Sequence, residues 1–278
     1  MSTLKLGANS SFPLDAFTNP PDVLEIFCTP FDKYMYAINK ITTLKELTFS
    51  NPAKVEDMPH IHALLVLLAK NPLLEKVVIL SPGAAMPAVR WPLHTSIQLP
   101  RLKYLSLELF RWEEAKYIIS RIPIMIPEME GIKVEIYCVD NSMRLNDAPE
   151  FVGVLARSLT SMTMNYPGSV ITWSGKKGRL SLSRVSDGDM RSALAGRCNF
   201  LSCENIESLE LKFGSLSPRL EPDVWLFPAI QTVTAYKEEY QPLDPSEGLR
   251  KFLKSLKMVT EDGLTDKRII WRKESVQA

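Results

Sequence analysis

The chain has 278 residues, 45% of them hydrophobic, which is enough to bury a large core in one or two domains. Its formal net charge of +1 gives no overall attraction to nucleic acid or to an anionic membrane surface. The sequence has no apolar run of about 18 residues and no signal peptide, so we expect an intracellular protein, cytoplasmic or nuclear. The four cysteines lack Cys-x-x-Cys spacing, and we expect reduced core residues at Cys28, Cys138, Cys198 and Cys203.

A loose phrase, Leu-x-x-Leu-x-Leu, recurs along the chain and predicts a series of similar strands. Two further strands are expected before the first copy, at 4–6 and 23–27. Copies up to residue 159 are spaced by 28 to 30 residues, near the upper end of the roughly 20–29 residues of a leucine-rich repeat. The copies begin at Leu44, Leu74, Leu102, Gly131 (a weak copy), Leu159, Ile206 and Ile230.

Helices are expected between these strands, at 61–70, 113–122, 151–159, 190–198 and 249–259. Asn71-Pro72 should stop the first of them. Asp147 and Asp189 are the expected N-caps of the third and fourth, and 244–247 resembles a capping box before the fifth. The longer gap between Leu159 and Ile206 predicts a hairpin with arms at 170–174 and 179–183, the second of which could also serve as a repeat strand.

A strand, loop and helix of this kind cannot bury its apolar edge alone, so successive units should stack. We therefore predict an α/β leucine-rich-repeat solenoid, with a curved, mostly parallel sheet and helices and loops on its outer side. The repeat domain should span 1–260, followed by a C-terminal strand or tail at 261–278.

Two passages resemble F-box/leucine-rich-repeat proteins, most of all their fungal group. Residues 67–77 resemble the family's helix followed by Asn/Cys-Pro-x-Leu-Glu-x-Leu, and residues 97–107 resemble its Leu-Pro-x-Leu-x-x-Leu-x-Leu strand. The similarity extends over roughly residues 1–260. It implies a protein-recognition role as the substrate-receptor arm of a Skp–cullin–F-box ubiquitin ligase.

The F-box itself is the part that does not fit. Pro20–Phe27 superficially resembles its opening, but the repeat strand at Leu44 leaves no room for its three helices. We therefore interpret 20–27 as a loop and a repeat strand, and expect an array, or a truncated relative, that lacks its F-box. A Skp-type adaptor is then a partner only if an F-box lies upstream. The alternative is a stand-alone repeat scaffold with no link to ubiquitin ligation.

Catalytic, metal and cofactor sites are not expected. His60, His62 and His94 have no carboxylate or cysteine at ligand spacing. There is no Gly-x-Ser-x-Gly motif, and an enzyme on an unrecognised fold is the least favoured interpretation. Gly175-Lys176-Lys177-Gly178 lacks the pattern of a phosphate-binding loop and indicates a hairpin turn.

The repeat surface has the clearest positional logic. Side chains alternate along a strand, so the third, fifth and seventh residues of each phrase should form three rows on the concave sheet face. These rows mix both charges with tyrosines, which are common contact residues. The expected partner-binding residues are Glu46, Lys76, Tyr104, Ser106, Glu108, Glu135, Tyr137, Asn165, Glu210, Lys212 and Tyr236.

Overall fold

The computed structural model describes residues 2–7, 20–27, 40–50, 61–81, 97–122, 131–139, 143–165, 169–194, 203–212, 227–236, 247–255, 258–260 and 268–273. The chain divides into two compact units, Met1–Asp140 and Asn141–Ala278. Each unit is built around its own run of strands.

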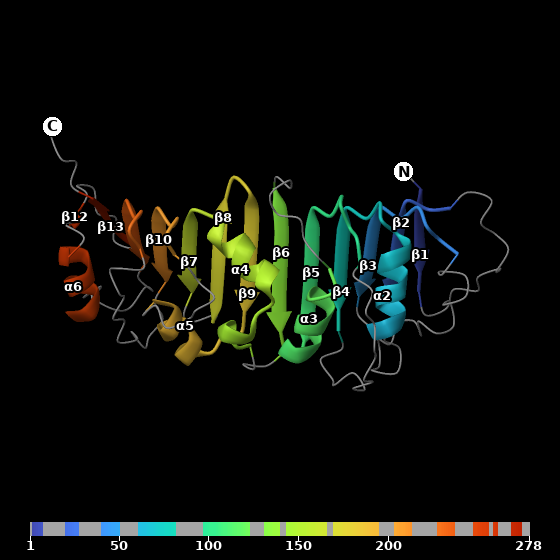
Figure 1. Ribbon diagram of the computed structural model, residues 1–278, viewed down its shortest axis with the longest axis horizontal. Coiled ribbons are helices and arrows are strands. Elements are labelled where there is room, and N and C mark those ends of the chain that lie inside the picture. The colour runs from blue at the N-terminus through green and yellow to red at the C-terminus, as the bar shows by residue number, and fades with distance from the viewer. Residues whose placement is uncertain are drawn as a thin grey trace. The chain divides into compact units, whose positions relative to one another are not determined.

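The strands of the first unit are all parallel, and their order in the sheet follows their order in the chain (Figure 1). All the strands expected in this part are confirmed, including the two before the first phrase. Val23–Phe27 is a strand between two parallel neighbours. The strands are β1 (Thr3–Leu6), β2 (Val23–Phe27), β3 (Glu46–Ser50), β4 (Lys76–Leu80), β5 (Tyr104–Phe110) and β6 (Ile132–Cys138).

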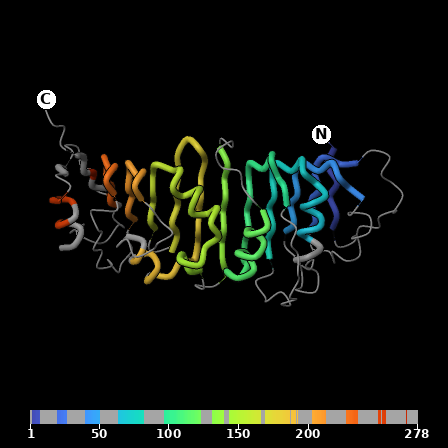
Figure 2. The backbone as a smooth tube through the Cα atoms, viewed as in Figure 1, coloured from blue at the N-terminus to red at the C-terminus, as the bar shows by residue number. Residues whose placement is uncertain are grey.

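Successive strands begin with the same hydrogen-bonding step. The backbone amides of Glu75 and Lys76 both donate to the carbonyl of Lys45, at 2.7 and 3.1 Å. A carbonyl oxygen has two lone pairs, so it can hold the second and third residues of the next phrase together. The register of one strand is thereby set by the strand before it, and Figure 2 shows the strands of the first unit side by side in chain order. The same step leads from Ser2 to Asp22 and Val23, from Asp22 to Lys45 and Glu46, and from Glu75 to Lys103 and Tyr104.

The core of this unit lies on one face of its sheet. Residues 41–50 and 71–80 show the same sequence of buried and partly exposed side chains, with the fourth and sixth phrase positions buried. Helix α2 (Ile61–Lys70) has the expected bounds, and α3 (Trp112–Ile119) is shorter than the expected 113–122. Helix α3 packs against β5 and β6, as Figure 1 shows. The helices bury Leu64, Leu65, Leu67, Leu68, Trp112, Ala115, Ile118 and Ile119.

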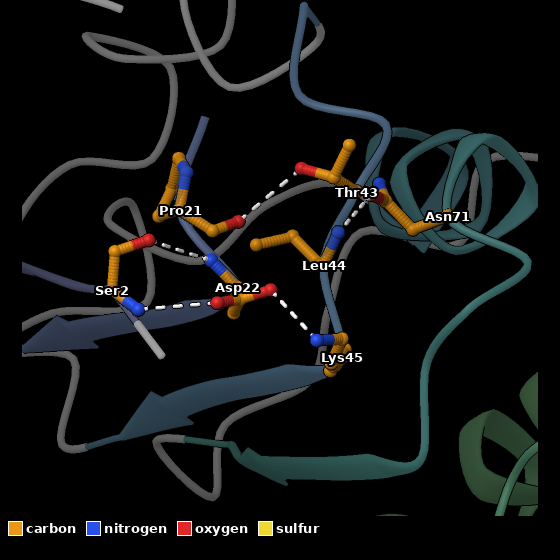
Figure 3. Close-up of polar contacts among 7 residues, drawn as sticks. All are labelled: Ser2, Pro21, Asp22, Thr43, Leu44, Lys45 and Asn71. Atoms are coloured by element: carbon orange, nitrogen blue, oxygen red, sulfur yellow. Dashed lines mark hydrogen bonds and ion pairs between the residues drawn. The ribbon is translucent and has the colours of Figure 1, made fainter. Parts of the chain in front are cut away.

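Asn71 joins the end of α2 to the loop before β3. Its side chain is fully buried, and its Oδ1 accepts from the amide of Leu44 at 3.0 Å (Figure 3). Its Nδ2 donates to the carbonyls of Ile41 and Leu67 at 3.1 and 2.9 Å. Asn71 therefore does more than stop the helix, because it satisfies backbone groups of two neighbouring segments that would otherwise be buried without partners.

The second unit combines parallel and antiparallel pairs. Strands β7, β10 and β11, which carry the phrase, pair in parallel. The predicted hairpin is confirmed as β8 and β9, paired antiparallel to each other, and β8 pairs antiparallel with β7. Beyond β11, β13 and β12 are added by antiparallel pairing. The bounds are β7 (Ser161–Asn165), β8 (Val170–Gly175), β9 (Gly178–Ser183), β10 (Ser208–Lys212), β11 (Thr232–Tyr236), β12 (Met258–Thr260) and β13 (Arg268–Lys273).

The helices of the second unit differ from expectation at their ends. Helix α4 (Glu150–Arg157) begins after Pro149, which makes no side-chain cap, and Asp147 lies in the short 3-10 helix η4 (Leu145–Asp147). The prediction that Asp147 caps this helix is therefore wrong. Proline at 149 disfavours helical backbone at 148, so α4 does not extend back toward Asp147.

Helix α5 (Asp187–Leu194) begins earlier than the expected 190. Ser186 Oγ accepts a hydrogen bond from the amide of Asp189 at 3.0 Å and lies 2.5 Å from its carboxylate. The N-cap is therefore Ser186 and not Asp189, which lies at the third helical position and accepts a hydrogen bond from the Ser186 hydroxyl. The expected capping box at 244–246 lies outside the described residues. Helix α6 (Glu247–Ser255) ends before the expected Val259, which belongs to β12.

The expected α/β class with a mostly parallel, open arrangement of strands is confirmed. Neighbouring described strands that both carry the phrase pair in parallel in each unit, and each described antiparallel pair of the second unit includes at least one strand without the phrase. Of the four cysteines, Cys138 and Cys203 are buried and not disulfide-bonded, whereas Cys28 and Cys198 lie outside the described residues.

Candidate functional site

The candidate site is the sheet face formed by the third, fifth and seventh residues of each phrase, here called the polar face. Its side chains are mostly partly exposed, while the alternate residues of the same strands are buried. Side chains under a packed helix would be fully buried, so most of this face remains accessible to solvent. The face is described separately for each unit.

In the first unit, the predicted rows lie in cross-strand register. Tyr104 stands beside Lys76 on one side and Lys133 on the other, and Ser106 stands beside Glu135. Seven predicted site residues are therefore brought together on four adjacent strands. They are Glu46 on β3, Lys76 on β4, Tyr104, Ser106 and Glu108 on β5, and Glu135 and Tyr137 on β6.

In the second unit, four predicted residues take the corresponding places. Asn165 on β7 pairs with Lys212 on β10, and Lys212 pairs with Tyr236 on β11. Glu210, at the row before, accepts a hydrogen bond from Thr163 Oγ1 at 3.1 Å and lies 3.2 Å from Lys212 Nζ. For Tyr236, the structure describes the backbone position in the strand.

Ion pairs neutralise part of the polar face of the first unit. Lys5 Nζ lies 2.8 Å from Glu25, and Lys76 Nζ lies 3.5 Å from Glu46. The lysine side chains are 66% and 45% exposed, so water and salt screen both pairs. These pairs contribute little to stability and leave the lysine ammonium groups accessible to another molecule.

The polar groups of β5 and β6 form a more enclosed cluster. Tyr104 Oη donates to Glu135 at 2.7 Å, and Ser106 Oγ donates to Glu108 at 2.9 Å. Burial raises the pKa of the Tyr104 hydroxyl above its ordinary value, and the hydrogen bond to Glu135 raises it further. Ser106 differs from the expected exposed row because it is only 1% exposed, its short side chain being covered by its larger neighbours. Tyr137, in contrast, is 37% exposed.

A second line of charges lies where the strands of the first unit begin, at the second position of the phrase. Lys45 Nζ lies 3.0 Å from Asp22, which also accepts from the amide of Ser2 (Figure 3). Lys103 Nζ lies 2.7 Å from Glu75. The hydrogen bond from each lysine is the largest cause of a lowered pKa at Asp22 and at Glu75.

Sequence reasoning missed this line of charges and the role of Asn71. The alternating signs of Lys45, Glu75 and Lys103, all at the second phrase position, were a usable signal, because equivalent positions of adjacent parallel strands become neighbours. Asn71 gave no comparable signal, since its three hydrogen bonds depend on the folded positions of two loops.

The sequence predicts no metal-binding, catalytic or phosphate-binding site elsewhere in the chain. Within the described residues, no group of three or more His, Cys, Asp or Glu side chains could hold a metal ion. His60 and His94 lie outside those residues, as does the side chain of His62. Gly175 to Gly178 is the turn of the β8–β9 hairpin, as expected.

Comparison with known proteins identifies no relative: no protein-family model, curated protein or solved structure matches this chain. Among the helices that the structure describes, none has the length and apolar character needed to cross a membrane.

Proposed function

We propose that this chain is a protein-recognition module, built as a leucine-rich-repeat solenoid, and that its polar face binds another protein. The observation that carries the proposal is the cross-strand register of the polar rows. Residues from four strands, far apart in sequence, form one array of lysine, glutamate and tyrosine side chains in the first unit. Such an array offers many spaced polar contacts, as a protein interface requires.

The recurrent strand start supports the repeat architecture. The double hydrogen bond to one carbonyl also occurs in the second unit, from Thr160 to Glu207 and Ser208 and from Glu207 to Gln231 and Thr232. Identical steps repeated along a chain are characteristic of solenoids, in which each repeat contacts its neighbours.

The resemblance to F-box/leucine-rich-repeat proteins supports a more specific proposal, the substrate-receptor arm of a Skp–cullin–F-box ubiquitin ligase or a relative of one. In the resembling passage, asparagine or cysteine precedes the phrase. Here Asn71 and Cys203 each lie three residues before a phrase, and both are buried. The agreement holds for these two copies, whereas Ile41, Leu99 and Phe227 take the equivalent position before other phrases.

Site-specific photo-crosslinking tests the proposed interface. A photoreactive phenylalanine analogue replaces Tyr137 on the polar face or, as the control, Glu113 on α3, whose side chain is 74% exposed. In host cells, we expect covalent adducts with another protein from position 137 and few from position 113. Adducts that form only from position 113 would show that the helix side, and not the polar face, binds partners.

Substitutions on the polar face give a second test, in which the affinity for the captured partner is measured. Lys76→Glu and Tyr104→Ala should each weaken binding of the full chain by about tenfold, and Glu113→Lys by less than about twofold. The lifetime of the captured partner also distinguishes a ligase substrate receptor from a stand-alone scaffold. A partner whose lifetime is extended by proteasome inhibition, and which co-purifies with a Skp-type adaptor, supports the ligase receptor. A partner with an unchanged lifetime supports the stand-alone scaffold.

A further inference from the structure

The carboxylates on the polar face of the first unit fall into two classes. Glu25 and Glu46 are each paired with a lysine of the neighbouring strand. Glu108 and Glu135 accept hydrogen bonds from uncharged hydroxyl groups, and no lysine or arginine among the described residues forms an ion pair with either of them. On β1 to β4 these carboxylates are therefore paired within the face, whereas on β5 and β6 Glu108 and Glu135 lie outside the ion pairs of the described residues, with the exposed Lys133 two residues from Glu135.

These two carboxylates are close enough to act together. Ser106 lies directly beside Glu135 across the strands, and Glu108 follows two residues later on the same face of β5. Glu108 and Glu135 are thus diagonal neighbours, for which the Cβ atoms of a sheet lie roughly 7–8 Å apart. A single guanidinium or ammonium group placed above Ser106 could contact both side chains.

Hydroxyl groups hold both carboxylates in place. Tyr104 Oη and Ser106 Oγ each donate to one oxygen, which leaves the other oxygen of each carboxylate to accept from a ligand. The raised pKa of Tyr104 agrees with a hydroxyl that keeps its proton in this position. The acceptors are therefore preorganised before any partner binds.

The residues around Glu108 and Glu135 can accommodate the methylene stem of a lysine or arginine side chain. Val78 stands beside Ser106, and Leu80 stands beside Glu108, so partly exposed aliphatic groups border the carboxylates on β4. Tyr137 stands beside Glu108 on the other side and exposes part of its ring. Lysine and arginine place their methylene stems on apolar surface, and their charged heads favour aromatic faces.

We infer that this part of the polar face binds one arginine or lysine side chain of a partner protein, with the charged head between Glu108 and Glu135 and the stem against Val78 and Leu80. The inference rests on the proposed function and specifies the chemistry of its partner. Lys133, exposed beside Tyr104, repels a second positive charge. The recognised segment is therefore a single basic residue among neutral or acidic ones, not a polybasic run.

The test uses a random dodecapeptide phage library selected on the immobilised full chain. Two double variants serve as a matched pair: E108Q/E135Q removes the two carboxylates without an ion pair, and E75Q/E113Q removes the same number of charges from carboxylates that are paired with lysines away from the polar face. Glutamine keeps a carbonyl oxygen to accept from Tyr104 and Ser106, so the fold is preserved, as circular dichroism of each variant would verify.

We expect peptides selected on the wild-type chain to share one Arg or Lys with neutral or acidic neighbours. Their dissociation constants, measured by fluorescence anisotropy, should rise about tenfold on E108Q/E135Q and less than about twofold on E75Q/E113Q. A selection with no basic residue in common, no selection at all, or equal effects of the two double variants would overturn the inference.

The outcomes also separate this inference from the proposed function. Selected peptides that lack basic residues but lose binding in Lys76→Glu or Tyr104→Ala would overturn the basic-residue site and leave the polar face as the interface. Peptides that bind equally well to every polar-face variant would contradict both.

Discussion

Strands β3 and β4 of the first unit and strands β7 and β8 of the second have similar burial but opposite pairing. All four alternate between partly exposed and buried side chains. The first two pair in parallel and the second two antiparallel. Alternation alone therefore does not determine the direction of pairing. Among the described strands, each double hydrogen bond at a strand start joins two strands that pair in parallel.

The two regions also join their strands differently. Parallel neighbours such as β3 and β4 need a long connection, which here includes α2, whereas β8 and β9 are joined by the two residues between Gly175 and Gly178. The hairpin thus adds sheet without adding a helix. Each difference leads to a measurable expectation.

The largest expected effect concerns the hairpin core. Trp173 on β8 is 1% exposed and lies between Met162 and Leu180 of the adjacent strands. Trp173→Ala should lower the free energy of unfolding by about 3–5 kcal/mol, because a large cavity replaces the ring. Urea denaturation, monitored by circular dichroism, measures this loss in the free energy of unfolding. Thr172→Val, on the opposite side of β8, should cost less than about 1 kcal/mol; equal losses in the two variants would mean that the hairpin contributes no core.

The next effect concerns the buried asparagine of the first unit. Asn71→Ala leaves the Leu44 amide and the Ile41 carbonyl without their partner, and should cost about 3 kcal/mol in the free energy of unfolding. Asn205 of the second unit is the matched control, since it is exposed and donates one hydrogen bond, to the Arg157 carbonyl at 2.8 Å. Asn205→Ala should cost less than about 1 kcal/mol. A small loss for Asn71→Ala would contradict its role as an anchor between segments.

The smallest effect concerns pH and the charges at the strand starts of the first unit. The pKa values of Asp22 and Glu75 are lowered by their lysines, so the stabilisation is present above the ordinary values of 3.8 and 4.5 and is lost as pH falls through the lowered ones. Carbon-13 NMR titration of the carboxyl groups should show each pKa rising toward its ordinary value in Lys45→Met and Lys103→Met respectively. Lys116→Met, which removes a helix ion pair, should leave both unchanged; an unmoved Asp22 pKa in Lys45→Met would refute the assignment.

The sequence was sufficient to predict the strands that carry the phrase, and their register, because the phrase combines two signals. Aliphatic alternation located β3, β4 and β5, and the spacing placed equivalent residues such as Lys76 and Tyr104 side by side. Seven of the proposed site residues were brought together in the first unit for this reason. Their role in binding remains a prediction.

Other features depended on interactions that the local pattern does not encode. Leu109 has a φ of 60°, and the pairing of β5 with β6 shifts there, which turns Phe110 into the core. The burial of Ser106 arises from the size of its neighbours on three strands. The cap of α5 was misassigned because serine and aspartate within three residues of each other can each act as the N-cap, and here Ser186 does so.

The carbonyl that accepts two amides affects how such a chain can tolerate insertions during evolution. Each strand is positioned by an atom of the strand it pairs with, so the intervening segment can lengthen without displacing the rows. The second unit gives an example, because Thr160 still holds Glu207 and Ser208 although a hairpin and α5 lie between them in the chain. Insertions between repeats can therefore accumulate while the surface presented by the strands is inherited intact.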